Sequence, residues 1–433
     1  MDGFCYFQVS QTVGVRSNRC SGSMTAENKS SLFHYGWVIV TAGTATLFAC
    51  LGLGRFALGM LLPSMGRELG LNYSQMGMVS TSNFIGYMVS VVLAGAVARW
   101  LGARLTIFSG LILTGCSMAV ISQADRFIPI ALLYFLTGIG SGLANVPMMG
   151  LISHWFLKNT RGRAAGFMLS GNGLAIVFAG FYVPWINSAQ GTAGWRTGWL
   201  TMGLICLAIA AVAVMLLKND PKEKGLSPFG RAGTEARSPE QKSSGRVIVH
   251  LGAVYALFGA TYVVYATFIV TAMVNERGFS EASAGLFWAV VGGLSILSGP
   301  FFGALSDRMG RKRALMLVFF LFTSAYVLAA ARLPDICLYI SILIFGLTVW
   351  SVPPIMSAAV GDYLGPEKAV RAFGFITVFF GGGQILGPLA AGFLADLSRT
   401  FGTAFWLSAA LTCAAIVLSA FLPEQPDKTI QEK

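Results

Sequence analysis

Long apolar stretches alternate with short polar segments along almost the whole chain. A hydrocarbon core about 30 Å thick needs about 20 helical residues to cross it. The pattern therefore predicts an all-α membrane protein with twelve spans, six before a polar middle segment and six after it. The predicted spans are 36–62, 73–98, 104–123, 127–152, 163–187, 196–217, 247–273, 282–305, 313–331, 335–360, 371–395 and 402–422.

The polar segments divide the chain into two membrane bundles and three parts outside them. We expect a disordered cytoplasmic tail over 1–34, a six-helix bundle over 35–217, a cytoplasmic middle loop over 218–246, a second six-helix bundle over 247–422 and a cytoplasmic tail over 423–433. Met24 opens a shorter and cleaner start than Met1, and the composition leaves both open as the true start.

The two predicted bundles are copies of each other. Gly77, Gly138 and Arg163 recur 208 residues later as Gly285, Gly346 and Arg371. Because six spans separate the copies, they share one orientation and form parallel repeats about an axis along the membrane normal. Repeats of this kind place a binding site between the halves near the bilayer midplane and expose it alternately on either side. The repeat therefore predicts a secondary transporter.

The composition excludes other classes of protein. Of the 433 residues, 55% are hydrophobic and 11% are charged, whereas a soluble domain has about 25% charged residues. The seven cysteines form no C-x-x-C pair. The chain also has no H-E-x-x-H motif and no nucleophile elbow. We therefore expect no enzyme activity, no cofactor and no metal.

Basic residues set the predicted orientation, because Lys and Arg in short loops resist translocation. With both termini in the cytoplasm, 23 Lys and Arg fall on the cytoplasmic side and six fall in the opposite loops. This asymmetry, together with contact with anionic membrane lipid, accounts for the net charge of +12, and nucleic-acid binding is not needed to explain it.

A loop between the eighth and ninth spans carries a recognisable motif. It reads Gly303-Ala-Leu-Ser-Asp307-Arg308-Met-Gly310-Arg311-Lys-Arg and resembles the motif G-x-L-a-D-R-x-G-R-k-x of the major facilitator superfamily. Gly310 is expected to supply the tight turn. The first-half copy departs from the motif, with Arg99 where the family has Asp. The resemblance implies a conformational latch, for which the candidates are Asp307, Arg308, Arg311, Arg163 and Arg371.

Two other stretches indicate a branch of the superfamily. The segments 34–40 and 155–166 resemble the monocarboxylate-porter and oxalate/formate-antiporter group, whereas Gly54-Arg55-Phe56 resembles another bacterial branch whose substrates are poorly defined. The first resemblance implies transport of a small organic anion, a monocarboxylate, across the bacterial inner membrane. An exporter of hydrophobic or drug-like compounds is the alternative, and a sensor that has lost transport is a third reading.

Arg55 is the exceptional charge, because every Asp and Glu lies in a tail, in a loop or at a span end. At 1.5 Å per residue it lies about 28 Å from Gly36 and about 10 Å from the end of its span. A guanidinium binds a carboxylate with two hydrogen bonds. Arg55 is therefore predicted to anchor an anion in the outer part of the span. Snorkelling to the lipid headgroups, or pairing with Glu276 as an outer gate, are the alternatives.

Polar and aromatic side chains at span centres complete the predicted site, although each one alone is also explained by an interhelical hydrogen bond or by close packing. They are Asn83, Tyr87, Asn145, Asn172, Tyr262, Trp350 and Gln384. Because no acid lies in mid-span, a coupled proton would travel with the substrate or through His250. Exchange and uniport also remain open, as does the direction of transport. We expect the protein to work as a monomer.

Overall fold

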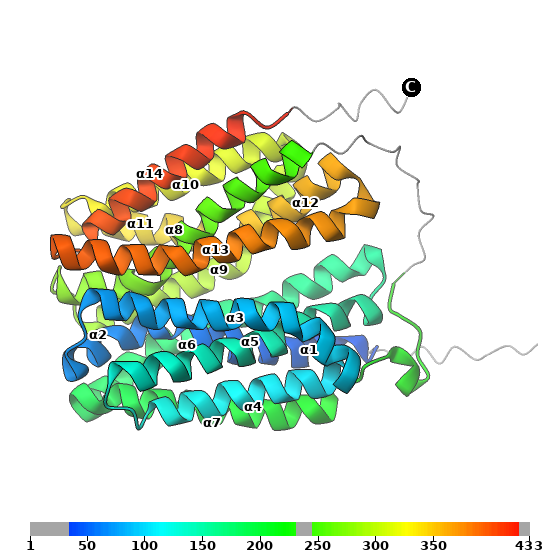
Figure 1. Ribbon diagram of the computed structural model, residues 1–433, viewed down its shortest axis with the longest axis horizontal. Helices are drawn as coiled ribbons and strands as arrows, with labels where there is room; N and C mark the ends of the chain where they lie inside the picture. The colour runs from blue at the N-terminus through cyan, green and yellow to red at the C-terminus, as the bar shows by residue number, and fades with distance from the viewer. Residues whose placement is uncertain (1–33, 231–244, 424–433) are drawn as a thin grey trace, which may run out of the picture. The chain divides into compact units, whose positions relative to one another are not determined.

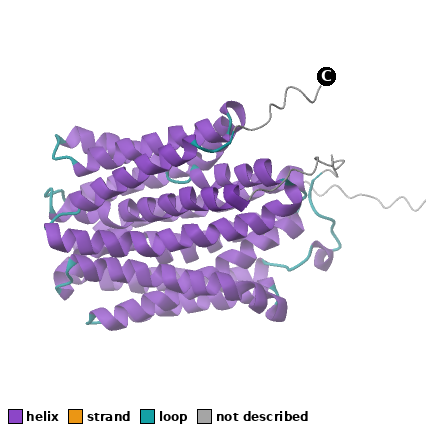
Figure 2. Ribbon diagram, turned by 45° about the horizontal axis from the view of Figure 1, so that its top comes forward, coloured by secondary structure: helices purple, strands orange, loops and turns teal. Residues whose placement is uncertain are grey.

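The computed structural model describes residues 34–230 and 245–423. Helices make up nearly all of this part of the chain, and no strand occurs in it (Figure 2). Twelve helices within it are long and apolar enough to cross a membrane, which confirms the predicted number. The expected tail up to residue 33, the centre of the middle loop and the last ten residues lie outside the described part.

Figure 1 follows the helices in chain order from blue to red. The first half contains α1 Gly36–Leu47, the π-helix η1 Phe48–Phe56, α2 Leu58–Leu69, α3 Tyr73–Leu101, α4 Ala103–Ile121, α5 Phe127–Trp155, α6 Lys158–Gln190, η2 Gly191–Ala193 and α7 Gly194–Leu216. The second half follows a short helix, η3 Pro221–Lys224, and contains α8 Gly245–Asn275, α9 Glu281–Met309, α10 Arg311–Ala330, α11 Asp335–Thr348, α12 Val352–Leu364, α13 Pro366–Ser398 and α14 Gly402–Ala420.

The helices confirm the internal repeat. α9, α10, α11, α13 and α14 each begin 208 residues after α3, α4, α5, α6 and α7 respectively. The turn before α10 repeats as well, because Gly310 has a φ of 87° and Gly102 has a φ of 81°. Only glycine adopts such a φ without strain, so the predicted turn at Gly310 is confirmed.

Small residues let the two halves approach closely. A side chain on Gly77 of α3 would meet the backbone of Pro388 in α13, and one on Gly285 of α9 would meet the backbone of Gly180 in α6. These two contacts are repeat equivalents of each other. Close backbone approach of this kind is how membrane helices associate in the absence of a hydrophobic driving force.

Two spans differ from their predicted course. The first continues to Leu69, because Pro63 lies inside α2 instead of ending the span at residue 62. It also widens into a π-helix over Phe48–Phe56, a form that often marks functional sites. The tenth span is broken at 349–351, which includes the predicted site residue Trp350, and Pro353 follows in the first turn of the next helix, α12, where proline is tolerated.

Candidate functional site

Arg55 is buried within η1, and its side chain is held by α3. Its Nε donates to Asn83 Oδ1 at 3.2 Å. Its guanidinium carbon lies 4.6 Å from the ring centroid of Phe84 and 4.3 Å from that of Tyr87. Contacts of a cation with ring faces at these distances are favourable. Asn83 and Tyr87, both predicted site residues, thus lie one helical turn apart on the face of α3 that meets Arg55, whereas Phe84 was not predicted.

A tyrosine of α5 fixes the backbone beside Arg55. The Tyr134 hydroxyl donates to the carbonyl oxygen of Arg55 at 3.1 Å, and the Tyr134 carbonyl accepts from Asn83 Nδ2 at 3.2 Å. Tyr134 lies within an apolar stretch of the sequence, where nothing distinguishes it from a packing residue. It couples the wide π-turn to the same asparagine that binds the guanidinium.

The structure corrects the expected depth and partner of Arg55. Because the first span runs from Gly36 to Leu69, Arg55 lies near its middle and not in its outer part. The side chain is 8% exposed, so it does not reach out of the bundle to headgroups. Glu276 instead accepts from Thr400 Oγ1 at 2.6 Å and from the Phe401 backbone N–H at 2.7 Å. The Arg55–Glu276 gate is therefore wrong for this structure.

Aromatic residues of the second half meet the first half next to Arg55. The rings of Phe56 and Trp350 are 5.3 Å apart and nearly perpendicular. Trp350 also contacts Tyr262 at 5.9 Å, and Gln384 Nε2 donates to the Tyr262 hydroxyl at 2.5 Å. These contacts bring the predicted residues of spans seven, ten and eleven to the boundary between the halves.

The two remaining predicted residues are asparagines of the first half. Asn145 Nδ2 donates to the Tyr87 hydroxyl at 2.8 Å, so Asn145 is one side chain away from Arg55. Asn172 is 4% exposed. It lies between Gly171, which packs against the backbone of Thr44 in α1, and Gly173, which packs against α9. Asn172 therefore also lies where the halves meet.

Several polar atoms of these residues have no hydrogen-bond partner. Nine buried side-chain nitrogen and oxygen atoms are unpaired in the described part of the chain, and four of them belong to predicted site residues. These four are Arg55 Nη2, Asn145 Oδ1, Asn172 Oδ1 and Trp350 Nε1. A buried unpaired polar group costs about 1–3 kcal/mol. Unpaired buried groups are expected where water, an ion or a ligand binds.

The charge of the site is also uncompensated. In the described spans, Arg55 is the one charged side chain more than about two helical turns from a span end. Its bonded partners, Asn83, Phe84 and Tyr87, are uncharged. A lone buried cation is costly within a membrane and is a functional candidate by default.

The candidate latch residues do not join the two halves in this structure. Arg311 pairs with Asp307 at 2.6 Å and with Asp362 at 2.8 Å, and all three lie in the second half. Across residues 34–230 and 245–423, no hydrogen bond or ion pair is found for the side chains of Arg163, Arg371 and Arg308. The network thus ties α9, α10 and α12 together.

The first half has lost this network. The positions 208 residues before Asp307, Arg311 and Asp362 hold Arg99, Ala103 and His154. Neither the central cation nor its two carboxylates remain, so the asymmetry extends beyond the single Arg99 departure seen in the loop motif.

Asp362 is expected to stabilise the second half more than Asp307 does. The Asp362 side chain is 25% exposed and the Asp307 side chain is 65% exposed, and exposed pairs contribute little. Asp362→Asn should lower the thermal unfolding midpoint of the purified protein by about 2–4 °C, because it leaves a buried guanidinium with a weaker partner. Asp307→Asn is the matched control and should lower it less. An equal effect of the two variants would contradict this ranking.

Carboxylates join the two halves at the end of the bundle where α2 ends and α3 begins. We call this end the opposite end, because it lies opposite the end where α10 begins with Arg311. Glu281 of α9 pairs with Arg67 of α2 and accepts from Asn187 Nδ2 of α6 at 2.6 Å. Asp396 of α13 accepts from the backbone N–H groups of Tyr73 and Ser74, both at 2.9 Å, and so caps the start of α3.

Hydrogen bonds between described residues of the two halves are found from this end as far as the level of Arg55. They include the pair Ser80–Thr267 at 3.3 Å and the bond from Thr81 to the Ile385 carbonyl at 3.1 Å. We call the other end, where α9 ends and α10 begins with Arg311, the basic end. Because the hydrogen bonds named here that join the two halves lie between the opposite end and the level of Arg55, the structure is closed at the opposite end.

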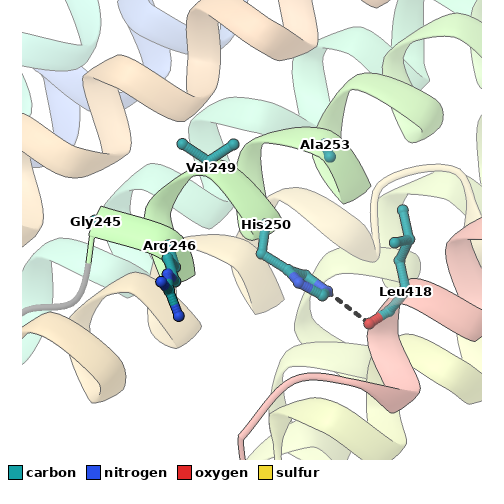
Figure 3. A pocket seen from close by; sticks show the side chains of 6 residues that line it. All are labelled: Gly245, Arg246, Val249, His250, Ala253 and Leu418. Atoms are coloured by element: carbon teal, nitrogen blue, oxygen red, sulfur yellow. Dashed lines mark hydrogen bonds between the residues drawn. The ribbon is translucent and has the colours of Figure 1, made fainter.

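A pocket of about 550 Å³ lies at the basic end, between the first turns of α8 and the end of α14 (Figure 3). Inside it, His250 Nε2 lies 2.7 Å from the Leu418 carbonyl oxygen. The same carbonyl also accepts from the Phe421 backbone N–H at 3.0 Å, so His250 adds a second contact at the end of α14. The imidazole thus has a structural contact, and none of the residues around Arg55 lines this pocket.

Comparison with known proteins identifies the relatives of the chain. The model of a family described as uncharacterised MFS-type transporter YbfB matches residues 47–420. The hexuronate transporter of Bacillus subtilis is 25% identical over 383 residues, which are 84% of this chain and 89% of that protein. Mouse monocarboxylate transporter 11 is 26% identical over 400 residues, 89% of this chain and 86% of that protein.

The fold also matches a solved structure. A bacterial homologue of the human lysosomal transporter Spinster, in an inward-facing and occupied conformation, aligns with a TM-score of 0.71. The alignment covers 91% of this chain and 98% of that one at 13% sequence identity. At this identity the match concerns the fold alone.

Proposed function

Because the chain belongs to the major facilitator superfamily of membrane transporters, we propose that it moves a small organic anion, a monocarboxylate, by alternating access. The buried guanidinium of Arg55, which has an unpaired Nη2 and no carboxylate among its bonded partners, carries the proposal. A carboxylate bound there would supply both the missing charge and the missing acceptors. Arg55 would then be the anchor of the substrate.

The chemistry of the site supports an anion over a neutral compound. A guanidinium stays charged and presents its donors in a fixed fork that fits a carboxylate. Asn83 already occupies Nε, and the rings of Phe84 and Tyr87 hold the guanidinium in place, so it is preorganised for binding. Of the two relatives compared above, one is named for hexuronate and the other for monocarboxylates, and both names denote carboxylate-bearing anions.

The contacts between the halves support a state that is open toward the cytoplasm. The loops of the basic end carry most of the Lys and Arg, so the positive-inside rule puts this end, and both termini, in the cytoplasm of a bacterial cell. The opposite end, closed by Glu281 and Asp396, then faces outward. Reorientation would break those contacts and bring the basic ends together, with Asp307, Arg308, Arg311, Arg163 and Arg371 as the candidates for a latch there.

Glu281 is expected to hold the outward-facing end closed. Glu281→Gln should raise, about five-fold, the rate at which an impermeant thiol reagent labels Thr271→Cys from outside, since a partly exposed ion pair contributes about 1 kcal/mol. Thr271 is fully buried in α8, and its hydroxyl has no partner, so the cysteine itself disturbs little. The seven native cysteines are replaced first.

Glu68→Gln is the matched control for this measurement. Glu68 bonds Trp195 and Arg196, both in the first half, so its loss should leave the labelling rate unchanged. Equal labelling rates of the Glu281→Gln and parent proteins would show that Glu281 does not hold the outward-facing end closed.

Uptake into proteoliposomes tests the proposed function. A panel of labelled monocarboxylates is offered beside a hydrophobic dye, which represents the competing function of drug export favoured by the aromatic residues around Trp350. Saturable uptake of at least one carboxylate is expected. Failure of every anion, with dye transport in its place, would overturn the proposal.

The same vesicles test coupling and assembly. With no mid-span acid among the described residues, we propose that a coupled proton accompanies the substrate or passes through His250, or that transport is exchange or uniport. Uptake that does not respond to an imposed pH gradient would exclude proton symport. We further propose that the monomer is the working unit, in contact with anionic lipid at its basic end.

A further inference from the structure

We infer that the transported anion carries at least one hydroxyl group in addition to its carboxylate, and that Asn145 and Asn172 accept hydrogen bonds from it. The inference rests on the proposed function and goes further, because it separates hydroxylated carboxylic acids from plain ones. The inference is based on whether each unpaired atom of the predicted site residues is a hydrogen-bond donor or an acceptor.

The four unpaired site atoms fall into two kinds. Arg55 Nη2 and Trp350 Nε1 can only donate hydrogen bonds, and they come from the first and second halves respectively. Asn145 Oδ1 and Asn172 Oδ1 can only accept. An ionised carboxylate accepts but cannot donate, so it satisfies the first pair and not the second. Satisfying the amide oxygens takes a donor on the same substrate.

One of the two acceptors lies beside the anchor, and the other lies where the two halves meet. Tyr87 contacts the Arg55 guanidinium with its ring and Asn145 with its hydroxyl, at 4.3 Å and 2.8 Å. Asn145 is therefore separated from Arg55 by a single side chain. Asn172, 4% exposed, lies in α6 where it meets both η1 and α9.

One hydrogen bond of the Asn145 amide identifies its free atom. Nδ2 donates to the Tyr87 hydroxyl at 2.8 Å, and Oδ1 is buried without a partner. The free atom of this amide is therefore an acceptor in the structure.

A hydroxyl is the donor that suits this site. An ammonium group on the substrate could also donate, but it would add a second positive charge beside Arg55. The residues that contact Arg55, namely Asn83, Phe84 and Tyr87, offer no carboxylate to balance that charge. A hydroxyl donates without charge. A site built to bond a hydroxyl discriminates strongly against an analogue that lacks it, because the polar groups of the protein are then left unpaired.

Paired acids that differ only in hydroxyl groups test the inference in proteoliposomes. Initial uptake is measured for labelled lactate against propionate and for labelled gluconate against hexanoate. At least one hydroxylated acid is expected to exceed its counterpart in kcat/KM by about ten-fold or more. Asn145→Leu and Asn172→Leu should reduce this ratio toward one.

Asn187→Leu is the matched control, because Asn187 also has an unpaired Oδ1 but bonds Glu281 and Ser64 at the opposite end. It should change the uptake of both acids alike and leave their ratio unchanged. Equal or faster uptake of propionate and hexanoate by the parent protein would overturn the inference and leave anion transport standing. Absence of uptake for all four acids, and for the wider carboxylate panel, would overturn the proposed function itself.

Discussion

Arg55→Gln is expected to lower kcat/KM for carboxylate uptake by about 100-fold or more. The substitution removes the buried charge that offsets the carboxylate, and truncating one member of a buried charged pair costs about 2–5 kcal/mol. The amide still reaches α3, so the fold should persist. The measurement is initial uptake of a transported acid into proteoliposomes with matched amounts of protein.

Arg55→Lys separates the contribution of the positive charge from that of the paired hydrogen bonds of the guanidinium. Lysine keeps the charge but cannot make the paired hydrogen bonds of a guanidinium, so an intermediate rate is expected. Arg196→Gln controls for loss of an arginine elsewhere, since Arg196 pairs with Glu68 and Asp125 within the first half. If Arg55→Gln transported carboxylates within two-fold of the parent rate, Arg55 would not be the anchor.

Exchange of internal for external substrate is expected to be at least about ten-fold faster than net efflux. The empty site carries an uncompensated buried cation, and reorienting it leaves that charge unpaired in a low-dielectric environment. A bound monocarboxylate neutralises the site, so the loaded protein reorients more easily. The measurement is loss of labelled substrate from loaded vesicles with and without unlabelled substrate outside.

Membrane potential provides a second readout of the same charge. Net efflux should respond to a potassium diffusion potential, whereas one-for-one exchange of monovalent anions moves no net charge and should not. Equal rates of exchange and net efflux, both insensitive to potential, would show that the charge of the empty site does not limit reorientation.

The sequence predicts the architecture well because the relevant signals are local. Span length and apolar composition identify twelve helices, and the offset of 208 residues matches the helix starts from α9 to α14, with the second part of the broken tenth span, α12, excepted. The cluster of Asn83 and Tyr87 around Arg55 is predictable for a similar reason. Residues four apart share a helix face, and a lone charge in an apolar span is conspicuous.

Features set by packing between distant segments are not predictable in this way. Phe84 and Tyr134 resemble ordinary apolar packing residues in the sequence, and only the approach of α3 and α5 to η1 makes them partners of Arg55. The apolar pattern predicts a first span that ends at residue 62, whereas the structure carries Pro63 within α2 and continues the span to Leu69, so Arg55 lies nearer the middle of the span than predicted. The contacts of Glu281, the proposed gate residue, likewise join segments that are far apart in the sequence.

Equilibrium binding to the purified protein addresses the anchor directly, without the complications of transport. Binding of a labelled carboxylic acid is measured by scintillation proximity for the parent protein and for Arg55→Gln, with the uncharged primary amide of the same acid as competitor. We expect the parent protein to bind the labelled acid and the amide not to compete for binding. We expect Arg55→Gln to show no binding of the acid. Equal affinity of the two proteins for the acid, or effective competition by the amide, would contradict an anion site at Arg55.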